Sequence, residues 1–109
     1  MTRLVRLWTE DGESRFSEES GLLEPGAARR VHAEESPPGS ALAWHEAPCR
    51  QYVITLTGIL RFTTRDGSSF RLGPGDVLLA DDTAGGGHRW ELIDDQPWRR
   101  VYVELDDQR

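Results

Sequence analysis

Three histidines, His32, His45 and His88, are the best candidates in this chain for acid–base or metal chemistry. Imidazole titrates near neutral pH and binds divalent metals. His32 precedes a charged segment and is interpreted as a surface residue. His45 and His88 lie in segments of alternating polar and apolar residues, on either side of the most strand-like segment, residues 51–57. The pattern therefore predicts that these two imidazoles face a common interior.

The same alternation predicts which neighbours share that interior. On segment 51–57, Gln51 lies on the same face as Val53 and Thr55, because successive side chains of a strand point to opposite sides. On the later segment, His88 shares a face with Trp90. The sequence thus predicts a pocket with His45, Gln51 and His88 as catalytic residues and with Val53, Thr55 and Trp90 as walls.

Two more side chains are candidates for substrate binding. Arg61 could clamp a carboxylate, although a surface ion pair is the alternative. Asp81 begins a glycine-rich loop at 81–87, which is either a mobile pocket rim that carries an acid or base, or a solvated turn. These glycines lack the lysine and the following helix of a phosphate-binding loop, so no nucleotide cofactor is expected.

The elements that must position these residues are short strands. Glycine and proline separate segments of period-2 alternation along the whole chain. Strands are predicted at residues 4–9, 14–20, 41–47, 51–57, 59–64, 70–72, 77–80, 88–93 and 99–105, with a mixed segment at 22–31 and a loop at 34–40. No stretch has a capped helical period. The chain is therefore predicted to be an all-β sandwich or small barrel, with one domain over residues 1–109.

Composition excludes several classes of function. Thirteen basic residues against 19 acidic ones give a net charge of −6, which disfavours nucleic acid. All the basic residues are arginine, so Schiff-base chemistry on a lysine is excluded. No apolar run approaches the ~18 residues of a membrane span, and no membrane partner is expected. The single Cys49 excludes an internal disulfide and indicates a cytoplasmic protein.

A homodimer is also expected from the strand pattern. Tyr52, Ile54 and Leu56 form the more apolar face of segment 51–57, which is predicted to pack on another sheet or on a partner chain. The N-terminal strand, residues 4–8, is predicted to add to the sheet edge of a partner.

The residues around His45 resemble the first motif of the cupin superfamily. In that motif a glycine is followed by five residues, His-x-His, three or four residues, Glu, six residues and a second glycine. Gly39 lies five residues before His45, and segment 44–51 is followed by six residues and a glycine. Residues 67–88 resemble the region of the second motif. The resemblance covers residues 39–93, half of the chain.

The resemblance implies a small β-barrel, which in this superfamily is often a dimer and often holds one divalent metal on three His and one Glu. His45 takes the first His position and His88 the His of the second motif. Ala47 replaces the second His, Gln51 falls on the Glu position, and Leu92 replaces the final Asn. Ala provides no ligand and Gln a poor one. A divalent metal on His45, Gln51 and His88 therefore remains open.

Two imidazoles and an amide inside an apolar barrel suit proton transfer and oxyanion stabilisation. The first hypothesis is a small-molecule enzyme of isomerase, cyclase, dehydratase or lyase type, with or without a metal. One alternative is a non-catalytic ligand-binding or structural cupin that has lost its metal site. The second alternative is a metal-dependent oxygenase.

Overall fold

The structure, a computed structural model, describes residues 3–20 and 25–106, and these form ten β-strands without any helix. The all-β prediction is confirmed. The strands are β1 (Arg3–Glu10), β2 (Glu13–Ser20), β3 (Ala28–Ser36), β4 (Ala41–His45), β5 (Gln51–Thr57), β6 (Leu60–Thr64), β7 (Ser69–Leu72), β8 (Val77–Asp81), β9 (His88–Leu92) and β10 (Trp98–Leu105). None of the described segments is a helix that could cross a membrane.

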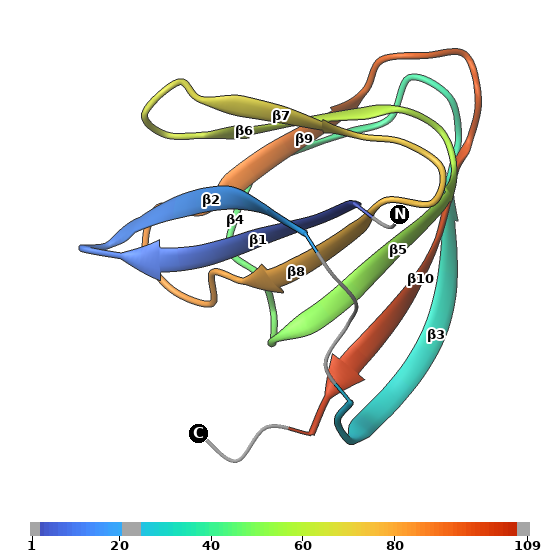
Figure 1. Ribbon diagram of the computed structural model, residues 1–109. Coiled ribbons are helices and arrows are strands. Elements are labelled where there is room, and N and C mark those ends of the chain that lie inside the picture. Colours follow the sequence, from blue (N-terminus) through green and yellow to red (C-terminus); the bar gives the residue numbers. More distant parts are fainter. Residues whose placement is uncertain (1–2, 21–24, 107–109) are drawn as a thin grey trace.

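The strands form two sheets that face each other (Figure 1). The larger sheet has the order β2-β1-β8-β5-β10-β3, and the smaller has the order β4-β9-β6-β7. Neighbouring strands are antiparallel except for the parallel pair β1 and β8. In Figure 1 the larger sheet curves from β2 at one edge to β3 at the other, which leaves a concave inner face under the smaller sheet.

The main hydrophobic core lies between the two sheets because alternate residues of each strand point inward. On β6, for example, Leu60 and Phe62 are buried, whereas Arg61 between them faces outward. Trp98 on β10 is almost fully buried and contacts Phe62 edge-on, so it joins the two sheets. One end of the barrel is therefore filled by large side chains.

The central strand β5 turns its more polar face inward. Gln51, Val53 and Thr55 are all buried inside the barrel. Tyr52 and Ile54 lie on the opposite, outer face, where they pack with Leu4, Val77, Leu79 and Leu105 in a second small cluster. The apolar face of this strand does not pack on the other sheet, so that part of the prediction is wrong.

Several predicted element boundaries are also corrected. Residues 34–36 belong to β3, not to a loop, because β10 pairs along β3 as far as Ser36. The strand predicted at 41–47 ends at His45, since the Ala47 amide leaves the ladder and donates to the Asp82 carbonyl. The N-terminal strand cannot add to the edge of a partner's sheet, because β1 is paired with β2 and with β8. The mixed segment at 22–31 lies partly outside the described residues.

Candidate functional site

A cavity of about 820 Å³ lies between the two sheets, and the core side chains of Phe62, Leu78 and Trp98 form part of its lining. Its lining includes His45, Gln51, His88, Val53 and Trp90. The structure therefore brings together five of the six residues predicted for the pocket. They come from β4, β5 and β9, so the cavity is built by both sheets.

The two imidazoles lie side by side because β4 and β9 are neighbours in the smaller sheet. His45 is the cross-strand partner of His88, after a register shift in the pairing between Leu42 and His45. The ring centroids are 4.4 Å apart, and the rings make an angle of 61°. One extra residue in a strand changes the face to which the next side chain points. The irregularity in β4 therefore affects the direction of the His45 side chain.

His88 is held by a chain of buried polar groups. Its Nδ1 lies 2.6 Å from Asp82 Oδ2, and Ser14 Oγ donates to the same oxygen over 2.5 Å. Asp82 and Ser14 have no exposed surface, and His88 is only 4% exposed. This contact orients the imidazole with Nδ1 toward Asp82, so that Nε2 is the ring nitrogen left for a ligand in the cavity that His88 lines.

His45 is oriented in the same way by its own strand. Its Nδ1 lies 2.8 Å from the carbonyl oxygen of Ala43, and a carbonyl only accepts. The proton is therefore on Nδ1, and Nε2 is again the basic atom. Burial lowers the pKa of His45 below 6.5, and the neighbouring His88 lowers it further, against the raising effect of the Ala43 carbonyl. His45 is thus a neutral base at physiological pH.

Gln51 and Cys49 form a third polar pair on the cavity wall. The Cys49 thiol lies 3.7 Å from Gln51 Oε1, which leaves the amide nitrogen of Gln51 as a donor for a ligand. Burial raises the pKa of Cys49, and Glu104 raises it further. The thiol therefore stays protonated, and Cys49 is a weak donor and not an activated nucleophile.

The glycine-rich loop that precedes His88 is packed against its neighbours. Gly87 has a φ of 74°, and a Cβ on it would overlap the backbone carbonyl of His45. Gly85 approaches the turn between β1 and β2 equally closely, and the Gly86 amide donates to the Gly12 carbonyl. These contacts explain the run of glycines as a means of close backbone approach. They hold His88 and His45 at a fixed separation.

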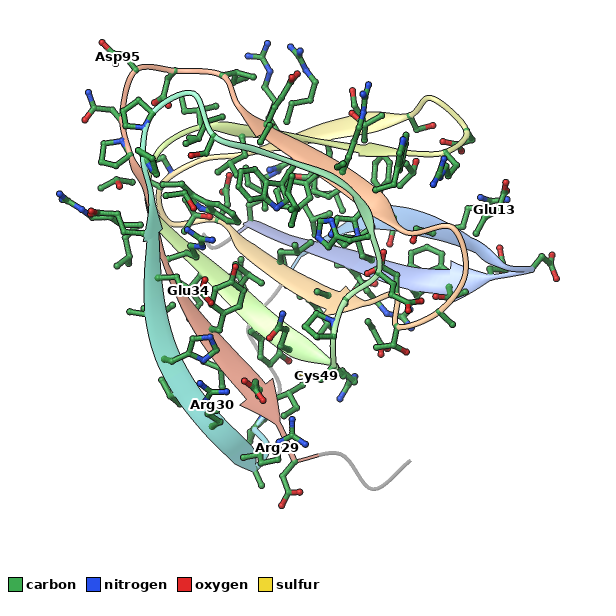
Figure 2. The ribbon with its side chains drawn as sticks, turned by 180° about the vertical axis from the view of Figure 1, so that it is seen from behind. Glu13, Arg29, Arg30, Glu34, Cys49 and Asp95 are labelled. Carbon is green, nitrogen blue, oxygen red and sulfur yellow. The ribbon has the colours of Figure 1, made fainter. Side chains whose placement is uncertain are left out.

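The opposite end of the cavity is open and charged. We call Arg29, Arg30, His32 and Glu34 of β3 the mouth, and all four line the cavity. Figure 2 shows Arg29, Arg30 and Glu34 along β3, with Cys49 on the other side of the opening. His32 stacks on Tyr102 with ring centroids 4.9 Å apart, so it belongs to the cavity wall and not only to the surface as predicted.

Three residues predicted to bind substrate lie elsewhere. Thr55 is buried behind Trp98, whose indole nitrogen donates to its hydroxyl, and it does not reach the cavity. Arg61 lies on the outer face of the smaller sheet and pairs with Glu91 over 3.3 Å. Asp81 pairs with Arg50 over 3.5 Å and is not part of the lining. The next residue, Asp82, takes the position beside the imidazoles.

Sequence reasoning missed three further residues with functional potential. Asp82 follows the end of β8, where alternation no longer gives a direction. Arg100 and Tyr102 line the cavity from β10. By alternation Arg100 lies on the same face of the strand as Trp98, which could have indicated an inward position. The apolar residues Val101 and Val103 lie on the other face, however, and in the sequence they favour that face as the inner one.

The cavity offers a poor set of metal ligands. The superfamily's best-known metal sites use three His and one Glu, whereas the groups beside the two imidazoles here are the neutral amide of Gln51 and the protonated thiol of Cys49. Within residues 3–20 and 25–106, no group of three or more His, Cys, Asp or Glu side chains is arranged to hold a metal ion. Two imidazoles and an amide do not fit such a metal centre.

Two facing sheets that enclose a cavity define a small β-barrel. Solved structures of similar shape identify the fold as the cupin fold. They include a cupin domain from Bordetella pertussis Tohama I, which is 23% identical, with a TM-score of 0.54 and coverage of 80% of this chain and 100% of that one. The cupin domain of a Schizosaccharomyces pombe protein is 15% identical, with a TM-score of 0.60 and coverage of 86% and 73%.

A cupin 2 conserved barrel domain protein from Salinispora arenicola is 18% identical, with a TM-score of 0.55 and coverage of 78% of this chain and 71% of that one. No protein-family model and no curated protein matches the sequence. The predicted cupin resemblance is thus confirmed for the fold. At these identities the likeness is one of fold, and function has to be argued from the cavity.

Proposed function

We propose that this chain is a small-molecule enzyme that transfers a proton at a carbon next to a carbonyl group, as isomerases, cyclases, dehydratases and lyases do. The observation that carries the proposal is the buried chain from Ser14 through Asp82 to His88. A carboxylate that fixes the tautomer of an imidazole and stabilises its protonated form is the arrangement that general bases use. A merely structural histidine does not need a lone pair directed into a cavity.

In this mechanism His88 is the base and Asp82 is its positioning residue. His88 Nε2 takes the proton from the substrate carbon, and Asp82 stabilises the positive charge that develops on the ring. The Gln51 amide donates a hydrogen bond to the carbonyl oxygen as it gains negative charge. His45, neutral and one ring away, can accept or return a proton at a neighbouring substrate atom. The buried walls around His88 reduce contact of the charged intermediate with water at that end of the cavity.

Proton exchange with solvent is the direct test of this proposal. Phenylpyruvate, α-ketobutyrate and the neutral diketone acetylacetone are incubated with the protein in D₂O, and loss of the C–H signal is followed by NMR. We expect exchange above the buffer rate for at least one compound, and a loss of about 10–100-fold in Asp82→Asn, as for other residues that position an imidazole. Metal chelation should leave the rate unchanged.

The matched control is Asp81→Asn. Asp81 is adjacent in sequence and carries the same charge, but it pairs with Arg50 outside the cavity. Its substitution should leave exchange unchanged. Exchange at the buffer rate for all three compounds, together with ligand binding in the cavity, would favour the non-catalytic binding alternative. Equal losses in both variants would contradict the positioning role of Asp82.

We also propose that the protein is a homodimer through the outer face of the larger sheet. Tyr52 and Ile54 lie on that face in a cluster with Leu4, Val77 and Leu79, and Leu56 beside them is 52% exposed. Leu56→Glu should lower the mass measured by light scattering if this face is the interface. A mass near that of one chain for the native protein would contradict the proposal.

A cytoplasmic location is proposed as well. It rests on Cys49, the only cysteine of the chain, whose partly exposed thiol would be kept reduced there. The net charge of −6 also argues against a nucleic-acid partner. Localisation of a tagged full-length protein in intact cells tests this point, and recovery outside the cytoplasm would contradict it.

A further inference from the structure

A buried arginine faces the cavity from β10. Arg100 is 5% exposed, although arginine is rarely this buried unless it is fully paired. It lines the same cavity as His45 and His88. The proposed mechanism does not use Arg100, so the burial of its charge has to be explained by the residues that surround it.

The partners of Arg100 leave one edge of the guanidinium open to a ligand. Nε donates to the Tyr102 hydroxyl over 3.1 Å, and Nη1 donates to Ser36 Oγ over 2.8 Å and to the Trp98 carbonyl over 3.1 Å. Among the residues that the structure describes, Nη2 lies near only Glu34 Oε1, at 3.7 Å, which is beyond hydrogen-bond distance. The Glu34 side chain is half exposed, so it can move into water when a better acceptor arrives.

The charge of the cavity differs from that of the whole chain. Nineteen acidic residues outnumber 13 basic ones overall. Among the lining residues, however, three arginines face two glutamates: Arg29, Arg30 and Arg100 against Glu34 and Glu104. Glu104 is already shared by Arg29 at 2.8 Å and Arg30 at 3.5 Å. The cavity is therefore a cationic region of an acidic protein, which favours an anionic ligand.

Aromatic rings connect the imidazoles to this cation. The Phe62 ring lies 5.7 Å from the His88 ring and 6.3 Å from Trp98. The Arg100 guanidinium lies over Trp98, 3.9 Å from the ring centroid, and Trp90 contacts Trp98 edge-on. A ligand that spans from His88 to Arg100 would thus lie against flat apolar surfaces.

From these observations we propose that Arg100 binds the carboxylate of the substrate, and that the substrate is a small carboxylic acid with a flat, unsaturated body. The proposal rests on the proposed function, since it takes the cavity as the active site. The substrate carboxylate displaces Glu34 and accepts a hydrogen bond from Arg100 Nη2. The reacting carbon of the substrate then lies at the His88 end of the cavity. Stacking on Trp98 and the bonds to Ser36 and Tyr102 keep the guanidinium in place before the ligand binds.

Paired acids and amides test the charge requirement directly. Benzoate, trans-cinnamate and naphthoate are compared by calorimetry with benzamide, trans-cinnamamide and naphthamide, which have the same shape without the charge. We expect at least one acid to bind about tenfold or more tightly than its amide, the effect of a hydrogen bond to a charged group. Arg100→Gln should remove the preference, and Arg100→Lys should restore part of it.

The next residue provides the matched control. Arg99 lies on the same strand and pairs with Glu35 on the outer face, so Arg99→Gln loses the same charge without touching the cavity. It should keep the preference for the acid. Equal binding of acids and amides, binding of no acid at millimolar concentration, or an equal loss in Arg99→Gln and Arg100→Gln would overturn the proposal.

A second pair of variants keeps the test valid if Arg100→Gln does not fold. Glu34→Gln removes the carboxylate that competes for Nη2, so acids should bind severalfold more tightly. Glu35→Gln, its neighbour on the other face of β3, should leave binding unchanged. Weaker or unchanged acid binding in Glu34→Gln would contradict the role of Arg100.

The same measurements separate failure of this inference from failure of the proposed function. His88→Gln should abolish proton exchange and keep the preference for acids. A preference for acids without any exchange would leave the carboxylate site standing and remove the enzyme. Exchange that is fastest for acetylacetone, with no preference for acids, would keep the enzyme and remove the carboxylate site.

Discussion

The two ends of the cavity are built from opposite kinds of contact. At the inner end, which comprises Ser14, His45, Asp82, Gly87 and His88, polar side chains are mostly buried and held by short hydrogen bonds and close backbone contacts. At the mouth, charged side chains are partly or largely exposed and are paired across β3 and β10. The inner end is suited to fix a reacting group, and the mouth is suited to admit and attract a ligand.

The difference follows from how the larger sheet is covered. β8 and β5 are near its centre and lie under the smaller sheet, so their inward side chains lose contact with water. β3 is the last strand of the larger sheet, and seven of its nine residues are exposed while the other two are only partly buried. Exposed ion pairs contribute little to stability, whereas unpaired groups in a buried region cost much more. Substitutions at the two ends should therefore differ sharply.

The largest difference should appear in catalysis. His88→Ala removes the proposed base and should lower the exchange rate by about 10²–10⁴-fold for the fastest compound of the D₂O panel. His32→Ala removes an imidazole from the mouth, where it stacks on Tyr102 and pairs with Glu34, and should change the rate by less than about threefold. A comparable loss in both variants would show that the inner end has no special role.

A backbone substitution should affect stability next most strongly. Gly87→Ala forces a Cβ into the His45 carbonyl at a positive φ, and should lower the free energy of unfolding by about 3 kcal/mol or more. Gly39 has a similar φ of 85° but open space around it, so Gly39→Ala should cost only about 1 kcal/mol. Urea denaturation measures the free energy of unfolding of both variants. An equal loss in the two would mean that the loop that contains Gly87 is not packed against His45.

Removal of one buried hydroxyl should have a smaller effect. Ser14→Ala deletes the donor to Asp82 Oδ2 and leaves that carboxylate less well paired, at a cost of about 1–3 kcal/mol. The exchange rate should also fall, because His88 is then held less firmly. Unchanged stability and unchanged rate together would show that Ser14 does not support the site.

The lowered pKa of His45 predicts how stability depends on pH. The folded protein keeps His45 neutral, whereas the unfolded chain protonates it near pH 6.5. Stability from this group is therefore fully present above that pH and decreases as the pH falls through it toward the lower pKa of the folded state. In His45→Gln the free energy of unfolding, measured by urea titration at a series of pH values below 6.5, should decrease less with falling pH than in the native protein. An unchanged pH profile in the variant would contradict the buried, neutral state of His45.

The smallest effect is expected at the mouth. Arg29→Gln breaks an ion pair with Glu104, yet the Arg29 side chain is 60% exposed and Arg30 remains beside the same carboxylate. The urea midpoint should stay unchanged within error, while binding of benzoate should weaken slightly and more at low salt. A clear loss of stability would mean that the mouth is part of the folded core.

Much of the fold could be predicted from alternation alone. β5 and β9 begin and end close to the predicted residues, and their periodicity correctly placed Gln51, Val53, His88 and Trp90 inside. Regular strands have a fixed period of two, so one inward residue determines the others. Arg61 was predicted to bind substrate, although the same rule, applied to the apolar residues Leu60 and Phe62 on either side, gives the outward position that the structure shows.

The rest could not be predicted because it depends on irregular or tertiary features. Asp82 lies in a loop, where alternation gives no direction, so the sequence does not distinguish it from its neighbour Asp81. On β10 the apolar residues Val101 and Val103 face outward and Arg100 faces inward, against the usual burial of apolar side chains. This reversal becomes visible only when the cavity and the outer face of the sheet are both in place.

The most direct test of the account is the protonation of the imidazole nitrogens. Long-range ¹H–¹⁵N NMR at neutral pH, assigned with His32→Gln and His45→Gln, reports which nitrogen of each ring carries the proton. We predict that His88 is protonated on Nδ1, toward Asp82, with an unprotonated Nε2 whose ¹⁵N signal shifts when cinnamate binds. A proton on Nε2 of neutral His88, or an Nε2 signal unaffected by a bound acid, would contradict the proposed base.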